Sequence, residues 1–252
     1  MSSRLRLWVL AAGGLGVAVL FVLACLDLPA FGGLWHPYGD RAVHAALARH
    51  TANTVSSVNF DQRAFDTLGE ESLLFGAVVG TVVLLRQTRD EGRLPPEPAT
   101  VAPPVRRYAL VALPVTLLIG LYVIAHGQLS PGGGFQGGIV AATALHLLYI
   151  AVDYRALERI RPVGLYEVAD AAGEAAYLLV GTAAVVTGAA FLTNFLPYGT
   201  FNTLSSGGTV PLLNAAIGVE VACGVVVLLA RFLDQAVEIE SGDRDDEAEA
   251  GT

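Results

Sequence analysis

Ionisable side chains within apolar segments are the first feature of this sequence that could carry chemistry. Glu220 lies near the middle of a long apolar run, in the stretch AAIGVEVACG, and His146 lies inside another. Desolvating a charge is costly, so an ionisable residue in a membrane-spanning segment is a functional candidate by default. No helix end accounts for Glu220, whereas His146 fits a hydrogen-bonded packing role equally well. Both are candidates for an ion or proton path.

Acidic residues also mark the start of an earlier apolar segment. Asp66 and Glu70 are four residues apart, so they share one face of a helix. Carboxylates clustered at a membrane boundary can attract cations or relay protons. The alternative is that acidic residues at a helix N-terminus complement the helix dipole. We favour this alternative for Glu71, and both interpretations stay open for Asp66 and Glu70.

A second acidic face precedes a later apolar run. Glu167, Asp170 and Glu174 follow an i, i+3, i+7 spacing, which places them on one helical face. Glu174 opens the apolar run and is a path candidate, while Glu167 is assigned to the helix dipole. His126, which closes an earlier run, is a further candidate. The cysteines stand in no CxxC or His/Cys pattern, and we expect no metal and no cofactor.

The elements that position these residues are predicted to be membrane helices. Of the 252 residues, 54% are hydrophobic and 15% are charged, whereas about a quarter of the residues in a soluble domain are charged. Six segments reach or approach the length of about 20 apolar residues that a bilayer requires. They are 7–26, 72–85, 108–125, 135–152, 175–196 and 210–232, and the first is expected to be a retained helix rather than a cleaved signal. The predicted fold class is all-α, a polytopic membrane protein with six transmembrane helices.

Charge patterning predicts the orientation and the domain organisation. All 15 basic residues are arginine, and only Arg41, Arg49 and Arg63 fall on one side of the predicted spans, so both termini are expected to be cytoplasmic. The net charge of −8 comes largely from a C-terminal tail, and no basic face exists for nucleic acid. The stretch LPPEPATVAPP predicts an extended linker. We expect a two-helix unit over 1–93, the linker over 94–107, a four-helix domain over 108–233 and an acidic tail over 234–252.

A glycine-rich loop, HGQLSPGGGFQGG, joins the third and fourth predicted spans. It allows three interpretations: an anion-binding nest, a broken helix lining an ion path, or close packing against a neighbouring subunit. An anion would lack a cationic partner, because no arginine occurs between Arg107 and Arg155. We favour close packing at a boundary between subunits. The residues assigned to this structural loop are Ser130, Pro131, Gly132, Gly133, Gly134, Phe135, Gly137 and Gly138.

Two regions of the chain resemble a known family. SPGGGFQGGIVAATALHLLYIAVD (130–153) and SGGTVPLLNAAIGVEVACGVVVLL (206–229) are similar to the B subunit of Mrp-type multisubunit Na⁺/H⁺ antiporters, in a match that covers 108–233. NTVSSVNFDQRAFDTLGEESLLFGAVVGTVVLLR (53–86) resembles the C-terminal part of the large A subunit, with its FDTLGE motif. The same module occurs as a separate small subunit in related complexes such as membrane-bound hydrogenases. Both pieces are fused in this chain.

The resemblance implies a transporter subunit rather than an enzyme. The implied role is a multi-pass subunit of a Mrp-type Na⁺(cation)/H⁺ antiporter in the inner (plasma) membrane of a prokaryote. The implied partners are the lipid bilayer, large complex I-like antiporter subunits and small membrane subunits. By motif, Asp66 and Glu70 are the strongest candidates for the ion path. The alternative is a structural subunit of a related redox-driven complex, of the hydrogenase or dehydrogenase type, that seals and couples larger subunits without conducting ions.

Overall fold

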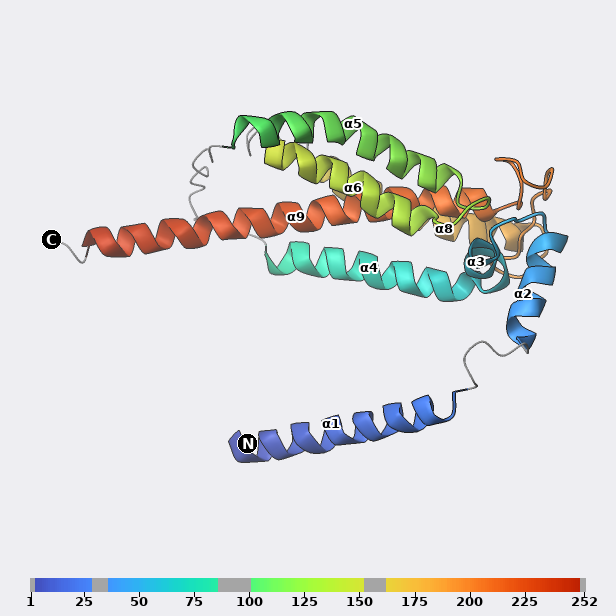
Figure 1. Ribbon diagram of the computed structural model, residues 1–252, viewed down its shortest axis with the longest axis horizontal. Coiled ribbons are helices and arrows are strands. Elements are labelled where there is room, and N and C mark those ends of the chain that lie inside the picture. The colour runs from blue at the N-terminus through green and yellow to red at the C-terminus, as the bar shows by residue number, and fades with distance from the viewer. Residues whose placement is uncertain (1–2, 29–35, 86–100, 152–161, 250–252) are drawn as a thin grey trace. The chain divides into compact units, whose positions relative to one another are not determined.

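The computed structural model describes residues 3–28, 36–85, 101–151 and 162–249. All regular elements within these residues are helices (Figure 1), which confirms the prediction of an all-α fold. The chain divides into two compact units, Met1–Asp40 and Arg41–Thr252. The first unit contains α1 (Ser3–Leu26), an apolar helix of 24 residues that is exposed along its length.

The second unit is a helical bundle preceded by short helices. α2 (Pro37–Ala48) leads into it and is followed by α3 (Thr54–Ser57) and the π-helix η1 (Val58–Gln62). Asn53 caps α3, because its side chain accepts hydrogen bonds from two backbone N–H groups of the first turn. The bundle helices are α4 (Ala64–Leu84), α5 (Pro103–Ala125), α6 (Gly134–Ala151), α8 (Val163–Val186) and α9 (Val210–Glu249).

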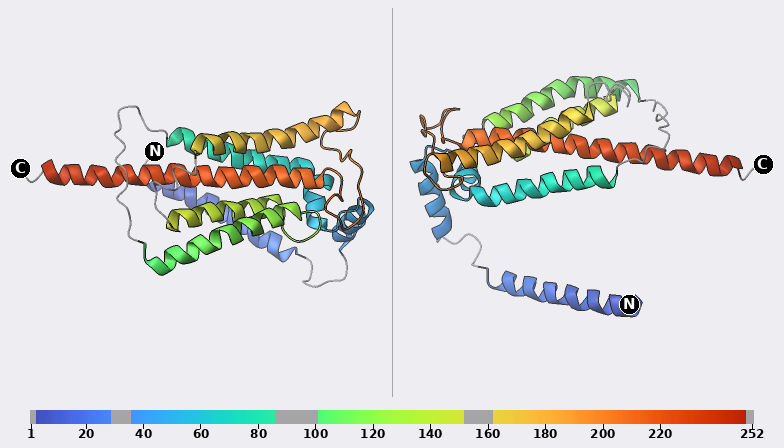
Figure 2. Two further views of the ribbon diagram at one scale, coloured as in Figure 1. Left: turned by 90° about the horizontal axis from the view of Figure 1, so that it is seen from above. Right: turned by 180° about the vertical axis from the view of Figure 1, so that it is seen from behind.

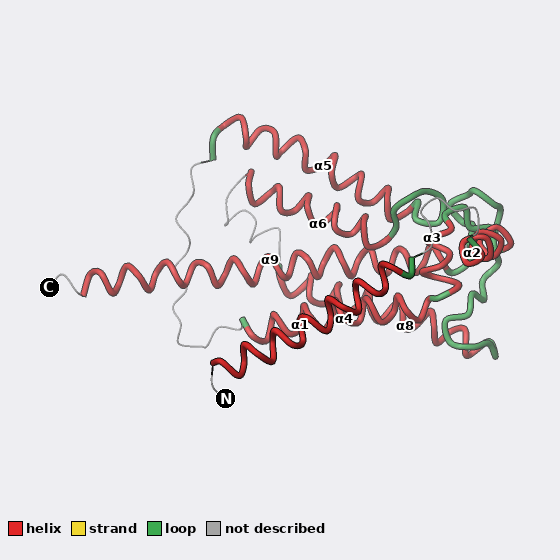
Figure 3. Tube along the Cα trace, turned by 60° about the horizontal axis from the view of Figure 1, so that its bottom comes forward, coloured by secondary structure: helices red, strands yellow, loops and turns green. Residues whose placement is uncertain are grey.

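Helix α9 is the centre of this unit. It contacts α4, α5, α6 and α8, and Figure 2 shows it between α4 and α8 on one side and α5 and α6 on the other. Three segments gather at one end of the bundle, which we call the loop end (Figure 3). They are the segment that contains α3 and η1, the connection between α5 and α6, and the segment that follows α8. α5 and α8 begin at the opposite end. We call it the arginine end, because Arg106 and Arg107 lie in the first turns of α5.

Apolar helices lie in the six predicted segments, but α4 begins at Ala64, eight residues before the predicted segment 72–85, and the fifth segment is displaced. Five of the described helices, α1, α4, α5, α8 and α9, have the length and composition to cross a membrane, and α6 is a shorter apolar helix. The fifth span was predicted over 175–196, but α8 begins 12 residues earlier, at Val163, and ends at Val186. Just after α8, Gly188 adopts a positive φ of 84° and the N–H of Ala189 bonds back to the carbonyl of Ala184, so the helix does not continue. Glu174 therefore lies in the middle of a helix and does not open one.

Glycines allow the helices of the bundle to approach backbone to backbone. A Cβ atom at Gly120 of α5 would lie 2.7 Å from the amide nitrogen of Ala141 on α6. A Cβ atom at Gly138 of α6 would lie 3.0 Å from the carbonyl oxygen of Gly218 on α9. Only glycine fits such contacts. The close packing predicted around the glycine-rich loop thus occurs within this chain, while the predicted boundary between subunits stays a prediction.

The compact second unit includes elements from both sides of the predicted linker. Helix α4 packs against α8 and α9, so it lies in the same unit as the helices that follow the proline-rich stretch. Within the predicted linker, 94–107, residues 94–100 lie outside the described residues. In the predicted acidic tail, 234–252, α9 continues as far as Glu249. The division into functional domains stays a prediction.

Candidate functional site

Four buried carboxyl groups meet where α4, α8 and α9 pack against one another. Glu71 comes from α4, Asp170 and Glu174 from α8, and Glu220 from α9. Their exposed fractions lie between 0% and 9%. The Glu220 carboxyl interacts electrostatically with the other three. We call these four residues the carboxyl cluster.

Hydrogen bonds join α4 to α8 beside the cluster. The Ser72 hydroxyl oxygen on α4 lies 2.7 Å from Oε1 of Glu174 and 2.8 Å from the carbonyl oxygen of Leu68. One turn along α8, the buried Tyr177 hydroxyl donates a 2.9 Å hydrogen bond to the carbonyl of Ala64. These contacts fix the position of the Glu174 side chain relative to α4.

Two glycines bring α8 and α9 close enough to enclose the cluster. A Cβ atom at Gly173 of α8 would lie 2.6 Å from Cβ of Glu220. A Cβ atom at Gly224 of α9 would lie 2.9 Å from Oδ1 of Asp170. The Asp170 carboxyl group therefore lies directly against the backbone of α9, where larger side chains would separate the helices.

The carboxyl cluster has more carboxyl oxygens than its surroundings supply with hydrogen bonds. Each of its four members has at least one buried carboxyl oxygen without a hydrogen-bond partner, and Glu220 has two. Buried carboxylates are costly unless a proton or a cation neutralises them. Among the described residues, no group of three or more His, Cys, Asp or Glu side chains has the arrangement of a metal site.

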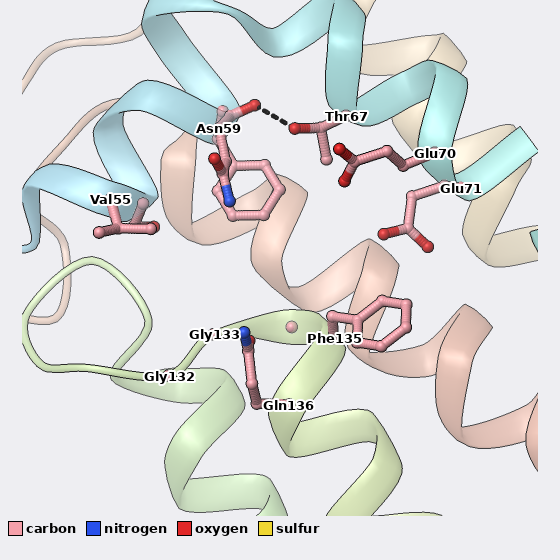
Figure 4. Close-up of a pocket in the computed structure, with 12 residues that line it drawn as sticks. Val55, Asn59, Thr67, Glu70, Glu71, Gly132, Gly133, Phe135 and Gln136 are labelled. Atoms are coloured by element: carbon pink, nitrogen blue, oxygen red, sulfur yellow. Dashed lines mark hydrogen bonds between the residues drawn. The ribbon is translucent and has the colours of Figure 1, made fainter. Parts of the chain in front are cut away.

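A cleft reaches the cluster from the loop end (Figure 4). It has a volume of about 230 Å³ and is lined by η1, the first turns of α4 and the glycine-rich loop. Figure 4 shows Glu71 opposite Phe135 across the cleft, with Thr67 and Glu70 on the α4 wall. Because Glu71 lines the cleft and also belongs to the cluster, it joins the two.

The glycine-rich loop is held in place as the opposite wall of this cleft. Gly132 and Gly133 have φ angles of 123° and 141°, which side chains other than glycine rarely adopt. The Asn53 amide donates 2.8 Å hydrogen bonds to the carbonyls of Gly127 and Ser130. Asn214 of α9 accepts a 2.8 Å hydrogen bond from the N–H of Gly134, at the start of α6. The loop is thus a hydrogen-bonded wall with its conformation set by α3 and α9.

The other predicted site residues lie outside the cluster. Asp66 is exposed and pairs with Arg63, whereas Glu70 lines the cleft without being buried. The His126 ring stacks on Tyr122 with its centroid 3.9 Å away. His146 is half-buried on α6, which packs against α5 and α9. Of the six predicted path residues, the structure thus brings Glu174 and Glu220 together.

Sequence reasoning gave no path role to two members of the cluster. Glu71 was assigned to the helix dipole, but α4 begins at Ala64, so Glu71 lies two turns inside the helix. Asp170 was placed on a face with Glu174 without being chosen as a candidate. Its position three residues after Glu167 and four before Glu174 was the signal that could have identified it.

An ion pair with one buried partner lies at the loop end. Arg49 Nη1 lies 3.0 Å from Oδ1 of Asp61, whose side chain is 3% exposed. Burial raises the pKa of Asp61 above its ordinary value, and the charge of Arg49 opposes this rise. Since the folded state then holds the proton more tightly than the unfolded state, the stability that this group contributes is lost as pH rises through the native pKa.

Replacing Arg49 with leucine is expected to destabilise the protein more at neutral than at acidic pH. At neutral pH the buried Asp61 carboxylate loses its counter-charge, a change that costs about 2 kcal/mol, less than for a fully buried pair because Arg49 is 36% exposed. At acidic pH Asp61 is protonated and the loss shrinks. Thermal unfolding at both pH values measures the difference. Arg63→Leu breaks an exposed pair and should cost less than about 1 kcal/mol. Equal losses for Arg49→Leu at both pH values would contradict the prediction.

The fold and this site define a multi-pass helical membrane protein with ionisable groups in its interior, and comparisons identify its family. Residues 104–227 match the family described as a domain related to the MnhB subunit of Na⁺/H⁺ antiporters. An uncharacterised protein of Methanocaldococcus jannaschii is 31% identical over 204 residues, which are 69% of this chain and 74% of that protein. The chain belongs to the family of proteins with a domain related to this antiporter subunit.

The chain is also similar to antiporter subunits and to chains of two solved membrane complexes. The B subunit of the Na⁺/H⁺ antiporter of Bacillus subtilis is 36% identical over 84 residues, which are 33% of this chain and 58% of that subunit. A chain of the archaeal membrane-bound sulfane sulfur reductase complex has a TM-score of 0.68 and 26% identity, covering 91% of this chain and 98% of that one. A chain of the Mrp complex from Dietzia sp. DQ12-45-1b shares the fold, with a TM-score of 0.67 and 24% identity, covering 92% of this chain and 26% of that one.

Proposed function

We propose that this chain is a membrane subunit of a Mrp-type multisubunit Na⁺(cation)/H⁺ antiporter and that its carboxyl cluster forms part of the ion path. The observation that carries the proposal is the burial of four carboxyl groups with unpartnered oxygens beside a cleft. The similarity to the B subunit of a Na⁺/H⁺ antiporter supports the same role.

The arrangement suggests how one set of groups serves two ions. Glu70 and Glu71 line the cleft and attract cations, and Glu71 leads on to the buried members of the cluster. A buried carboxylate is neutralised by a proton or by a cation, but it does not need both. Competition for the same oxygens therefore couples the entry of one ion to the release of the other.

We further propose six membrane spans, formed by the five long apolar helices and α6, with the arginine end and both termini on the cytoplasmic side of a prokaryotic plasma membrane. Support comes from the lengths of these helices and from the arginine count of the connecting segments. The proposed partners are large antiporter subunits and small membrane subunits.

A second candidate function is a structural subunit of a related redox-driven complex, which seals and couples larger subunits. The observation in its favour is the similarity to a chain of the sulfane sulfur reductase complex, which extends over 98% of that chain. In this role the carboxyl cluster would stabilise contacts without exchanging ions, so neutral substitutions in the cluster would leave ion exchange intact.

Glu71→Gln tests the proposed function at the junction between the cleft and the cluster. We expect exchange in everted membrane vesicles to fall by about 10²-fold, the order of effect seen when a proton-transferring group is removed. Glu70→Gln should cause a smaller loss, because Glu70 is exposed to the cleft. Asp66→Asn in the same assay tests the prediction from the FDTLGE motif.

The control for this experiment is Asp40→Asn, which removes an exposed carboxylate on α2. It should leave exchange at the wild-type rate. Assembly of each variant is followed by native electrophoresis of the complex. Normal exchange by a fully assembled Glu71→Gln complex would favour the structural role.

A further inference from the structure

The two ends of the carboxyl cluster differ in charge. Toward the loop end the cluster meets the cleft, and every ionisable group that lines the cleft is acidic. Toward the arginine end it meets an ion pair between α8 and α9, in which Nη2 of Arg231 donates a 2.6 Å hydrogen bond to Oε1 of Glu167. No arginine lines the cleft, whereas Arg231 lies at the other end of the cluster.

Helical geometry places this ion pair in line with the cluster. Glu167, Asp170 and Glu174 share one face of α8, so Asp170 lies between the ion pair and the rest of the cluster. Along α9, Arg231 follows Glu220 by 11 residues, which is about 16 Å of helix. The Asp170 oxygen beside Gly224 is buried without a hydrogen-bond partner. The acidic face of α8 thus continues from the cluster to the ion pair.

The two partners of the ion pair act differently on protons and on metal cations. The guanidinium of arginine keeps its charge at all physiological pH values, so Arg231 repels cations and does not carry protons. The carboxyl group of Glu167 can bind and release a proton. The pair is also partly buried, with side-chain exposures of 23% for Arg231 and 36% for Glu167, so water screens the guanidinium charge incompletely.

We propose that the Glu167–Arg231 ion pair is a selectivity gate at the arginine end of the carboxyl cluster. Arg231 excludes metal cations from this end, and Glu167 passes protons between the cluster and the adjoining water. Arginines exclude cations from narrow pores by the same electrostatic principle. The inference rests on the proposed function, because it gives the cluster separate routes for the two ions.

The test uses the complete complex in proteoliposomes that contain radioactive sodium, and it follows sodium efflux and proton uptake together, so that efflux without matching proton uptake is the uncoupled part. Arg231→Gln is expected to increase the uncoupled efflux of sodium by at least about tenfold, which corresponds to about 1.4 kcal/mol of barrier. Arg231→Lys keeps a positive charge and should restore most of the exclusion. Arg106→Gln removes an exposed arginine at the start of α5 and serves as the matched control. If the Arg231→Gln complex shows no increase in the uncoupled efflux of sodium, the proposal is overturned.

Glu167→Gln provides a second test of the selectivity gate, which can be carried out even if the Arg231→Gln complex does not assemble. It removes the proton-binding group but keeps the guanidinium. Sodium efflux without matching proton uptake should therefore stay low, while proton-coupled exchange falls by at least about tenfold. A sodium leak through Glu167→Gln, or exchange at the full rate, would contradict the gate.

Glu220→Gln separates a failure of the gate from a failure of the proposed function. If Glu220→Gln leaves exchange intact, the cluster is not on the ion path and the proposed function fails. If Glu220→Gln stops exchange while Arg231→Gln does not increase the sodium leak, the cluster is still supported as part of the ion path, and only the proposed selectivity gate is contradicted. In the double variant, the leak caused by Arg231→Gln should disappear, because sodium would need Glu220 to cross.

Discussion

Replacing Glu220 with glutamine is expected to reduce cation/proton exchange by about 10²-fold or more, while the complex still assembles. Glu220 is fully buried on the central helix, with both carboxyl oxygens unpartnered, and it interacts with the other three members of the cluster. Glutamine has nearly the same shape but neither ionises nor carries a proton between partners. The packing of α9 against α8 is therefore preserved and the chemistry is lost.

The measurement is the rate of pH change in everted vesicles after addition of sodium, normalised to the amount of assembled complex. Glu220→Asp keeps a carboxyl group and should retain more exchange than Glu220→Gln. Asp40→Asn controls for the loss of an acidic residue outside the cluster. If the glutamine variant retains as much exchange as the aspartate variant, the loss of an ionisable carboxyl group does not explain the effect.

Gly173→Val is expected to abolish exchange by forcing α8 away from α9. The first carbon of the new side chain would meet the backbone nitrogen of Glu220 at 2.8 Å and the carbonyl oxygen of Ala216 at 2.8 Å. Neither atom belongs to a flexible side chain, so the helices must separate. Overpacking of this kind costs about 1–3 kcal/mol, and it displaces the carboxyl groups of α8 from Glu220.

Gly164→Val is the matched control for this prediction, because it places the same side chain on the same helix. A Cβ atom at Gly164 meets nothing within 4 Å among the described residues. Thermal unfolding of the purified complex and vesicle exchange are measured for both variants. We expect a lower melting temperature and no exchange with Gly173→Val, and nearly wild-type values with Gly164→Val. Equal behaviour of the two variants would contradict the role of close helix packing.

The fold was predictable where hydrophobic length alone decides it. Long apolar runs indicated α1, α4, α5, α6 and α9, because few other structures bury so many consecutive apolar residues in a bilayer. The fifth span was misplaced for a physical reason. Three acidic residues in the first half of α8 face other helices, so a long stretch of this helix is less apolar than its neighbours. The irregular segment after α8 contains apolar residues such as Phe191 and Leu192, which sequence hydropathy does not separate from the helix.

The candidate site was predictable for residues whose burial follows from the sequence itself. Glu220 stands in an apolar run with no helix end nearby, so its selection needed no tertiary information. Glu71 differs from Glu70 by one position, about 100° around a helix. Only the packing of α4 against α8 and α9 shows which of the two faces the interior. The contribution of Asp170 depends in the same way on the approach of α9 at Gly224.

The Ser72 hydroxyl has one hydrogen and two acceptors within reach, the carbonyl of Leu68 and the carboxyl of Glu174. When Glu174 is ionised, the hydroxyl hydrogen can turn toward it. When Glu174 carries a proton, the carboxyl can donate to the hydroxyl oxygen, and the hydroxyl hydrogen turns to the carbonyl of its own helix. Ser72 is thus a rotor with two resting positions, so that proton uptake at Glu174 leaves this contact satisfied in both states and requires no movement of α4.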